Sequence, residues 1–379
     1  MEKPFGKSGN DCNMSVLFND IYRGKTVFVT GHTGFKGSWL SLWLANLGAK
    51  VIGYSLDIPT NPSHFKLLHL KQVSLVGNVT DRKKLPEIIK KYKPEIIFHL
   101  AAQPLVRQSY LNPVEAFESN VMGTINLLES CRKCNFIKAV INVTSDKCYR
   151  NNEPTQSYRE SDPMGGSDPY SASKSCADIV AFAYRQSFFN PSQFDKNHKT
   201  LLASVRAGNV VGGGDWAKDR LIPDIIRATS RGEVVTLRYP QATRSWQHVL
   251  EPLSGYLHLG WKLLEGKKQF ADDWNFGPDH RLNLTVQGVI TQAQKYWPKT
   301  RHKIKRDRTN WPEATLLMLD STKARHDLKW KSVWDVQKTF EKTILWYKNY
   351  YEHGNILSQK DLDEYIHDAK QASVEWAKS

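Results

Sequence analysis

The sequence predicts an α/β fold in which a doubly wound parallel sheet is followed by a smaller C-terminal lobe. Strand-like and helix-like segments alternate from Lys25 to about Asn209. The strand-like segments, such as 139–144 and 201–206, are nearly continuous apolar runs, as expected for parallel strands that are covered on both faces. From Gly212 onward, glycines and prolines interrupt shorter elements, which indicates a separate lobe over the carboxyl ends of the strands.

The domain boundaries are expected where this pattern changes. Residues 25–211 form the sheet domain, and the apolar helical stretch at about 245–272 returns the chain to it. Two segments form the smaller lobe, which is expected to bind the substrate: 212–244 and 273–355. The two ends of the chain are expected to be an N-terminal leader and a C-terminal tail: 1–24 and 356–379.

The composition is that of a protein with a large core and no membrane segment. Its 379 residues are 40% hydrophobic, and none of the apolar stretches approaches the length of about 20 residues that spans a bilayer. The N-terminus lacks the charged and then apolar pattern of a secretion signal. We therefore expect a cytoplasmic protein that makes no contact with membranes.

The chain is basic, with 53 Lys and Arg against 38 Asp and Glu and a formal charge of +15. Such an excess speeds association with anionic partners, whether nucleic acids or small molecules. The densest basic run, 299–308, has no interleaved aromatic residues of the kind that stack on single-stranded nucleic acid. A solvated basic face is the commoner use of such a run, so no nucleic-acid binding is expected.

The five cysteines do not form a disulfide framework or a metal-binding pattern. Cys131 and Cys134 are spaced like a metal-binding pair, but no second cysteine pair or histidine pair accompanies them. We expect reduced thiols and no metal site.

A glycine-rich turn, Gly31-His-Thr-Gly34-Phe-Lys-Gly37, lies between an apolar run at 26–29 and a helical pattern. Glycines allow a sharp turn and a close approach to a pyrophosphate, and the helix N-terminus faces the anion. A second strand ends at Asp57, about 20 residues past the last glycine, where an acid binds the adenosine ribose. The alternative is a surface turn with an ordinary loop aspartate. The order of strand, turn, helix, strand and acid favours a Rossmann-type dinucleotide site.

Tyr170 and Lys174 lie four positions apart in a helical pattern, downstream of Ser145-Asp146-Lys147. Positions i and i+4 share one helix face, so the phenol and the ammonium group can meet above one ligand. A nearby cation lowers the pKa of a phenol, which would make Tyr170 a usable base near neutral pH. The alternative is a solvated pair on an ordinary helix.

These motifs together resemble the extended short-chain dehydrogenase/reductase superfamily, over residues from about 25 to about 350. Three segments, which begin at Gly31, Thr144 and Arg206, are similar to CDP-glucose 4,6-dehydratases: Gly-His-Thr-Gly-Phe-Lys-Gly, Thr-Ser-Asp-Lys-Cys-Tyr and Arg-Ala-Gly-Asn-Val-Val-Gly-Gly-Gly-Asp-Trp. That family removes water from CDP-glucose to give the 4-keto-6-deoxy sugar, with a bound NAD that is reduced and reoxidised in each turnover. The resemblance implies the same activity here, in deoxysugar synthesis for surface polysaccharides such as O-antigen.

The resemblance assigns five catalytic residues. Ser145 would hydrogen-bond the 4-hydroxyl of the sugar, Tyr170 would take its proton, and Lys174 would hold the nicotinamide ribose. Elimination then needs a base at C5 and an acid at the C6 oxygen, which would be Lys147 and Asp146. The dTDP-glucose relatives resemble Asp-Glu at this place, and the alternative for Asp146-Lys147 is an ion pair that caps a strand end.

The remaining predicted contacts divide into a cofactor set and a substrate set. The cofactor set, with NAD favoured over NADP because Asp57 would repel a 2′-phosphate, is Gly31, His32, Thr33, Gly34, Phe35, Lys36, Gly37, Asp57, Asn78, Val79, Leu100, Ala101, Ala102, Thr144, Tyr170 and Lys174. Of these, His32 and Lys36 are unusual, since relatives often carry small or apolar side chains there. The substrate set, for CDP-glucose, is Gln103, Arg206, Asn209, Asp215, Trp216, Arg220 and Arg244. Within it, Arg206 could equally form a structural ion pair.

Three other functions remain open from the residues alone. They are a nucleotide-sugar 4-epimerase, a 4,6-dehydratase acting on another nucleotide sugar, and an NAD-sensing binding protein without catalysis. The resemblance also implies a homodimer or homotetramer that pairs the helices at 113–134 and 169–187.

Overall fold

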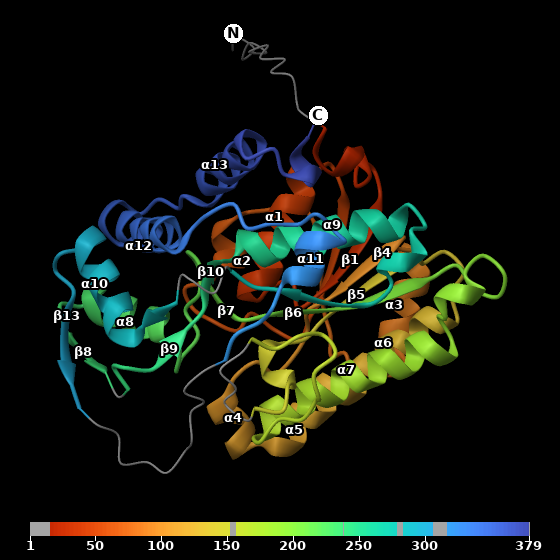
Figure 1. The fold of residues 1–379 in the computed structure, drawn as a ribbon, viewed down its shortest axis with the longest axis horizontal. Helices are drawn as coiled ribbons and strands as arrows, with labels where there is room; N and C mark the ends of the chain where they lie inside the picture. Colours follow the sequence, from red (N-terminus) through yellow and green to blue (C-terminus); the bar gives the residue numbers. More distant parts are fainter. Residues whose placement is uncertain (1–15, 152–156, 238, 279–282, 306–316, 379) are drawn as a thin grey trace, which may run out of the picture.

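The centre of the molecule is a seven-stranded parallel sheet in the order β11-β6-β5-β4-β1-β2-β3, drawn in Figure 1. The computed structural model describes residues 16–151, 157–237, 239–278, 283–305 and 317–378. In sheet order the strands are β11 (Asp273–Phe276), β6 (Leu201–Ala207), β5 (Ala139–Val143), β4 (Ile96–His99), β1 (Thr26–Thr30), β2 (Lys50–Ser55) and β3 (Val73–Val76). The predicted doubly wound parallel sheet is confirmed.

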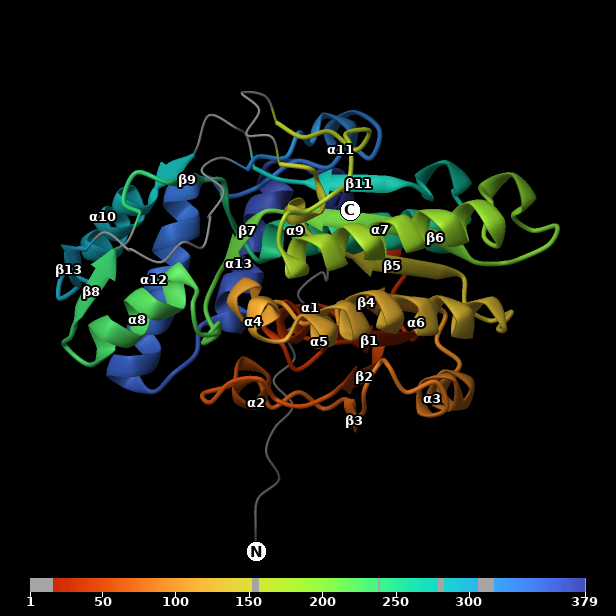
Figure 2. The same ribbon diagram turned by 90° about the horizontal axis from the view of Figure 1, so that it is seen from below.

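Alternate side chains of the central strands pack on opposite faces of the sheet. Val27 and Val29 of β1 belong to one hydrophobic core, whereas Phe28 between them belongs to another. Helices cover both faces, as Figures 1 and 2 show. On one face lie α1 (Phe35–Asn46), α9 (Leu250–Leu264), α11 (Thr322–His326) and α13 (Ser358–Gln371). On the other lie α3 (Lys84–Tyr92), α6 (Gly123–Arg132) and α7 (Pro169–Ser187).

The smaller lobe lies at one end of the sheet domain in both views (Figures 1 and 2). It has its own core, to which Trp216, Trp297 and Trp346 contribute. Its elements are α8 (Leu221–Ser230), β8 (Val234–Leu237), β9 (Thr243–Arg244), β12 (Leu284–Thr285), α10 (Val286–Tyr296), β13 (Arg301–Ile304) and α12 (Val336–His353). At its junction with the sheet, β7 (Asn209–Val211) pairs in parallel with β10 (Trp246–His248).

Short elements complete the walls around the carboxyl ends of the strands. They are α2 (His64–Leu67), α4 (Val106–Leu111), α5 (Pro113–Phe117), the π-helical turn η2 (Glu118–Met122) and the 3-10 turn η3 (Asp146–Cys148). The helix expected at 113–134 is therefore interrupted, whereas the helix expected at 169–187 has the predicted bounds. Outside the walls lie three more 3-10 turns: η1 (Leu17–Asp20), η4 (Pro191–Gln193) and η5 (Lys268–Phe270).

Three predicted boundaries are wrong. The lobe was expected to resume at 273, but β11 pairs with β6 as an edge strand of the main sheet. The expected leader ends in η1, where Phe18 is fully buried against Trp376 with ring centroids 5.1 Å apart. The expected tail is α13 followed by a 3-10 turn, η7 (Glu375–Ala377), both packed on the main core. Residues 1–15 of the predicted leader lie outside the described residues.

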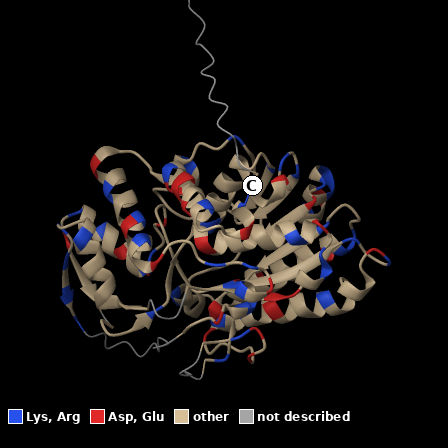
Figure 3. Cartoon of the chain, turned by 45° about the horizontal axis from the view of Figure 1, so that its top comes forward, with Lys and Arg blue, Asp and Glu red and all other residues tan. Residues whose placement is uncertain are grey.

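The described residues contain no helix that is long and apolar enough to cross a membrane. Within the same ranges, no group of three or more His, Cys, Asp or Glu side chains could hold a metal ion. Basic and acidic residues are interspersed over the lobe and the sheet domain in the view of Figure 3. Of the predicted basic run, only 299–305 is described, and Arg301 to Ile304 form β13.

Candidate active site

One cavity of about 1240 Å³ runs from the glycine turn, across the carboxyl ends of the strands, to the lobe. All five predicted catalytic residues line it. Every predicted cofactor residue except His32 lines it, and so does every predicted substrate residue except Arg206 and Trp216. The predicted site residues therefore lie around one connected cavity, apart from three that do not line it.

The glycine turn fits a closely approaching dinucleotide because its backbone is packed without room for side chains. Gly31 has a φ of +75°, and a Cβ added there would lie 2.8 Å from the backbone nitrogen of Ala101. A Cβ on Gly37 would lie 2.1 Å from the carbonyl oxygen of Gly31. The turn leads into α1, which has its first residue at Phe35 and whose N-terminal amides suit an anion.

The residues at the end of β2 line one end of the cavity, where the adenosine contact was predicted. Asp57 is exposed, and its Oδ1 accepts a hydrogen bond of 2.6 Å from the backbone nitrogen of Ile58, so the carboxylate is held in a turn. Asn78 lines the same end, but its Oδ1 accepts from the backbone nitrogen of Thr80 at 3.0 Å. The predicted adenine contact of Asn78 would therefore have to use the amide nitrogen or replace this bond.

His32 does not face the cavity, which corrects its predicted cofactor contact. Its ring lies against Gly53 and exchanges hydrogen bonds with Ser55 at 2.8 Å and Ser74 at 2.7 Å. Burial lowers the pKa of His32 to about 4, so the ring is neutral near pH 7. A neutral ring cannot attract the 2′-phosphate of NADP, so His32 does not favour NADP over NAD. The histidine instead braces β1 against β2 and β3.

Lys36 does face the cavity and belongs to a group of cations around Asp146. The pKa of Lys36 is lowered to about 8, mainly by burial and also by the charges of Arg220 and Lys174, while Asp146 opposes the fall. An amine with this pKa is readily discharged, because three cations share one enclosed space.

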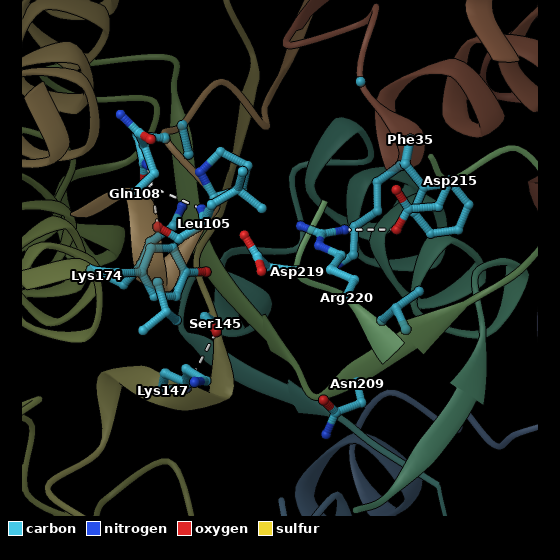
Figure 4. Close-up of a pocket in the computed structure, with 18 of the residues that line it drawn as sticks. Phe35, Leu105, Gln108, Ser145, Lys147, Lys174, Asn209, Asp215, Asp219 and Arg220 are labelled. Atoms are coloured by element: carbon cyan, nitrogen blue, oxygen red, sulfur yellow. Dashed lines mark hydrogen bonds and ion pairs between the residues drawn. The ribbon is translucent and has the colours of Figure 1, made fainter. Parts of the chain in front are cut away.

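The predicted catalytic residues come from β5, η3 and α7. Ser145 donates a hydrogen bond of 2.9 Å to Asp146 Oδ1, and Lys174 Nζ donates one of 3.2 Å to the carbonyl of Val143. Figure 4 shows Ser145, Lys147 and Lys174 together on one side of the cavity. These side chains can therefore surround one sugar ring.

The pKa of Tyr170 does not fall as the sequence suggested. It is raised to about 12, mainly by burial and also by Asp146, while the nearby Ser145 hydroxyl and Arg220 oppose the rise. Burial lowers the pKa of Lys174 to about 8, against the charge of Asp178. In the protein alone, the desolvation of the phenol outweighs the neighbouring cations, so the expected activation of Tyr170 by Lys174 is wrong for this state.

Asp146 is 5% exposed, and burial raises its pKa, while Lys147, Ser145 and Lys36 oppose the rise. A raised carboxyl pKa favours the protonated form, which is the form that a general acid needs. Lys147 lines the same cavity, and its backbone nitrogen donates to Ser145 Oγ at 3.2 Å. The acid and the candidate base are thus consecutive residues at the end of one strand.

The lobe side of the cavity carries the predicted substrate residues. Arg220 Nη1 pairs with Asp215 Oδ2 at 2.9 Å, and Figure 4 places both opposite Ser145 and Lys174. Arg244 lies on β9 and donates to the carbonyl of its neighbour Thr243 at 2.9 Å. The side chain of Gln103 is bonded to the backbone of Leu105. Its Nε2 donates to the Leu105 carbonyl at 3.2 Å, and its Oε1 accepts from the Leu105 nitrogen at 3.2 Å. Its side chain shapes the wall of the cavity.

Two predicted substrate residues point elsewhere. Arg206 is fully buried behind the sheet, where it pairs with Asp178 at 3.1 Å and Asp273 at 3.2 Å. Its neighbours Val205 and Ala207 pack on the opposite face, so strand alternation turns Arg206 toward α7. Trp216 packs in the lobe core, and its Nε1 donates to Tyr351 at 3.1 Å.

The sequence analysis did not identify two residues that support the site by hydrogen bonds from outside the cavity lining. Asn120, 1% exposed, donates to Ser173 Oγ at 2.8 Å and accepts from the backbone nitrogen of Gln103 at 2.8 Å. Ser109 Oγ accepts from the backbone nitrogen of Tyr170 at 3.0 Å. A buried asparagine inside an apolar helical stretch was the available signal for the first of these.

The model of the GDP-mannose 4,6 dehydratase family matches residues 28–343. A CDP-glucose 4,6-dehydratase of Salmonella typhimurium is 48% identical over 355 residues, which are 93% of this chain and 99% of that protein. The chain belongs to the CDP-glucose 4,6-dehydratase family. The resemblance seen in the glycine turn and in Thr144 to Tyr149 is therefore confirmed over nearly the whole chain.

More distant relatives of this dehydratase family include epimerases. A UDP-glucose 4-epimerase of Mycoplasma genitalium is 24% identical over 347 residues, 86% of this chain and 97% of that protein. An epimerase structure from Methanothermobacter thermautotrophicus has a TM-score of 0.75 at 21% identity, covering 91% and 98% of the two chains. A dTDP-glucose 4,6-dehydratase of Bacillus anthracis, solved in complex with NAD, has a TM-score of 0.71 at 21% identity, covering 87% and 98%. These two structures confirm the fold.

Proposed function

We propose that this protein is an NAD-dependent dehydratase that converts CDP-D-glucose to CDP-4-dehydro-6-deoxy-D-glucose and water. The observation that carries the proposal is the cavity in which Asp146 and Lys147 join Ser145, Tyr170 and Lys174. The relative with 48% identity over 93% of the chain has this activity by name, which supports the same substrate here.

NAD fits the cofactor end of the cavity. Gly31 and Gly37 carry no side chain where the backbone is tightly packed, the N-terminus of α1 would face the pyrophosphate, and Asp57 would accept hydrogen bonds from the ribose hydroxyls. When bound, NAD supplies a reversible acceptor for the hydride that leaves the sugar. Lys174 would hold the nicotinamide ribose and place a positive charge beside Tyr170.

The first step is oxidation at C4. Tyr170 takes the proton of the 4-hydroxyl, which Ser145 orients, while hydride leaves C4. Since burial holds the pKa of Tyr170 at about 12, the phenol keeps its proton until further positive charge reaches this enclosed space. Coupling the activation of the base to cofactor binding prevents proton transfer in an incomplete site.

The second step is loss of water across C5 and C6. The 4-keto group acidifies the C5 hydrogen, which Lys147 removes as a proton while Asp146 delivers its own proton to the departing C6 hydroxyl. Addition of a hydride at C6 and a proton at C5 would then complete the 4-keto-6-deoxy sugar. The raised pKa of Asp146 supports its role as the acid.

The nucleotide of the substrate occupies the lobe end of the cavity. Arg220 and Arg244 are placed to neutralise the diphosphate, because a guanidinium fork matches phosphate oxygens. Beyond them the wall is apolar, with Ile222, Val235 and Leu237, and offers a slot for the base. Asn209 completes this wall from β7.

The active protein is proposed to be a homodimer or homotetramer paired through the helices at 113–134 and 169–187. Exposed apolar side chains on those helices support this: Val114 at 64%, Phe117 at 38%, Ile179 at 53% and Phe182 at 51% exposure. Large exposed apolar patches commonly mark association surfaces. Light scattering that gives a 43.4 kDa species at working concentration would contradict it.

The function is tested by incubating purified protein and NAD separately with CDP-glucose, dTDP-glucose, UDP-glucose and GDP-mannose. A 4-keto-6-deoxy product, detected by its absorbance in alkali, is expected from CDP-glucose. A 4-epimer would favour the epimerase alternative, product from another nucleotide sugar would change the substrate, and NAD binding without turnover would indicate a sensor.

A further inference from the structure

Asp178 lies one helical turn beyond Lys174 on α7, so the two side chains share a helix face. It is 3% exposed. Its Oδ2 accepts a hydrogen bond of 2.7 Å from Thr144 Oγ1 and one of 3.1 Å from Arg206 Nε. Thr144 directly precedes Ser145, so the carboxylate holds the end of β5 against the helix that carries Tyr170 and Lys174.

Arg206 extends this contact into a buried network. Its Nη1 donates to the Tyr149 hydroxyl at 2.6 Å, and that hydroxyl donates to Asn275 Oδ1 at 2.8 Å. Its Nη2 pairs with Asp273 at 3.2 Å. The network therefore joins β6, β11, α7 and the segment after η3. Desolvation offsets the attraction within a buried ion pair, so such pairs are weak evidence for a stabilising role. The network lies beside the predicted catalytic residues, which suggests a role in positioning them.

The second carboxylate oxygen, Asp178 Oδ1, is buried and has no hydrogen-bond partner among the described residues. Its charge raises the pKa of Lys174, whereas burial lowers that pKa to about 8. The other titratable groups around Lys174 are Tyr170 of the same helix, Cys148 of η3, Lys36 of α1 and His99 of β4. Asp178 supplies the carboxylate among the described groups that act on Lys174.

We propose that Asp178 is a positioning residue for the dehydratase reaction, which fixes Thr144 and Ser145 against α7 and places a carboxylate on the helix face that carries Lys174. Arg206 orients the carboxylate and pairs with only one of its oxygens. Asp178 does not line the cavity, so it acts through Thr144 and through Lys174 on the same helix face. The inference rests on the proposed function for its kinetic test but not for its chemical test.

The chemical test compares wild type with Asp178→Asn, which keeps the size of the side chain and removes its charge. Trace acetylation across the neutral and alkaline range, followed by peptide mass spectrometry, gives the pH at which Lys174 becomes reactive. Loss of a neighbouring carboxylate lowers the pKa of an ammonium group, by about 1 to 3 units for close pairs. Lys174 of the variant should therefore react at lower pH. An unchanged profile in the folded variant overturns the proposal.

The kinetic test uses the same pair with CDP-glucose and saturating NAD. Because catalysis needs the Lys174 ammonium, the alkaline fall of kcat should move to lower pH in Asp178→Asn, and lower pH should recover part of the lost rate. A loss that is equal at every pH contradicts the charge role. If wild type does not turn over CDP-glucose, the proposed function fails while the acetylation result still decides the inference.

Two further variants separate position from charge and from stability. Thr144→Val removes the hydrogen bond to Asp178 and keeps the carboxylate, so kcat should fall severalfold without a shift of its alkaline limb. An unchanged kcat overturns the positioning role, even where Asp178→Asn does not fold. Arg185→Lys is the matched control, since Arg185 on the same helix pairs with Asp273 at 2.8 Å. It should lower the unfolding temperature and leave the Lys174 profile unchanged.

Discussion

The cofactor end of the cavity is built from strand ends of the main sheet, whereas the substrate end is built from loops and short strands of the lobe. At the first end, Gly31 and Gly37 lie in backbone contact, and a single added methyl group would collide with main-chain atoms. At the second, Arg220 and Arg244 project from separate elements and are partly exposed. A change at the cofactor end should therefore disturb folding and binding together, while a change at the substrate end should weaken binding alone.

The largest effect is expected between the two ends, at Lys147. In Lys147→Ala, oxidation at C4 should continue, because Ser145, Tyr170 and Lys174 remain. Water loss should slow by about a hundred- to ten-thousandfold, the usual contribution of a positioned acid or base. Stopped-flow absorbance should then show NADH that persists with CDP-glucose. Tyr170→Phe is the control, with no NADH signal. Dehydration at a near-normal rate in Lys147→Ala would make Lys147 structural and require another base.

The next largest effect is expected at the cofactor end of the cavity, in the glycine turn. Gly37→Ala places a Cβ 2.1 Å from the carbonyl oxygen of Gly31, so the turn must shift. We expect a lower unfolding temperature and no measurable NAD binding by calorimetry. Gly34→Ala is the milder control, since its Cβ would lie 3.3 Å from the same oxygen. Equal NAD affinity in Gly37→Ala and wild type would show that the turn is not the pyrophosphate site.

A smaller effect is expected at the substrate end of the cavity. Arg244→Ala should raise KM for CDP-glucose about ten- to a hundredfold, the usual range for a lost hydrogen bond to a charged group, with the unfolding temperature nearly unchanged. Arg206→Lys is the contrast, since Arg206 is fully buried in ion pairs. It should lower the unfolding temperature. The comparison fails if Arg244→Ala destabilises the protein as much as Arg206→Lys does.

The smallest effect is expected at Asp57, which is exposed. Asp57→Ala should weaken NAD binding and narrow the preference for NAD over NADP, because the carboxylate no longer repels a 2′-phosphate. Asp57→Asn separates charge from turn geometry, since the amide oxygen can still accept from Ile58. Fluorescence titration with both nucleotides measures the change. Identical NAD affinity in both variants and wild type would remove Asp57 from the site.

The same contrast explains how far the sequence could be interpreted. Contacts at the cofactor end follow from local order along the chain, because strand, turn and helix fix where Gly31 to Gly37 lie. Contacts at the substrate end depend on which way a side chain points. Arg206 lies three residues before Asn209, yet strand alternation sends it to the opposite face. Asp215 lines the cavity, and Trp216 beside it turns into the lobe core.

The ends of the chain were misjudged for a different reason. No chemical motif marks the C-terminal segment, but Leu362, Tyr365 and Ala369 recur at helical spacing and are all fully buried. That periodicity was available in the sequence. The burial of Phe18 against Trp376 was not, because it joins opposite ends of the chain.

The most direct measurement follows the hydrogen at C4 through one reaction. CDP-glucose carrying deuterium at C4 is converted by wild-type protein with NAD in ordinary water, and the product is examined by NMR. Our account predicts deuterium at C6, since the hydride that leaves C4 is delivered to C6 after Lys147 and Asp146 remove water. A product with deuterium retained at C4 and the 6-hydroxyl intact would contradict it.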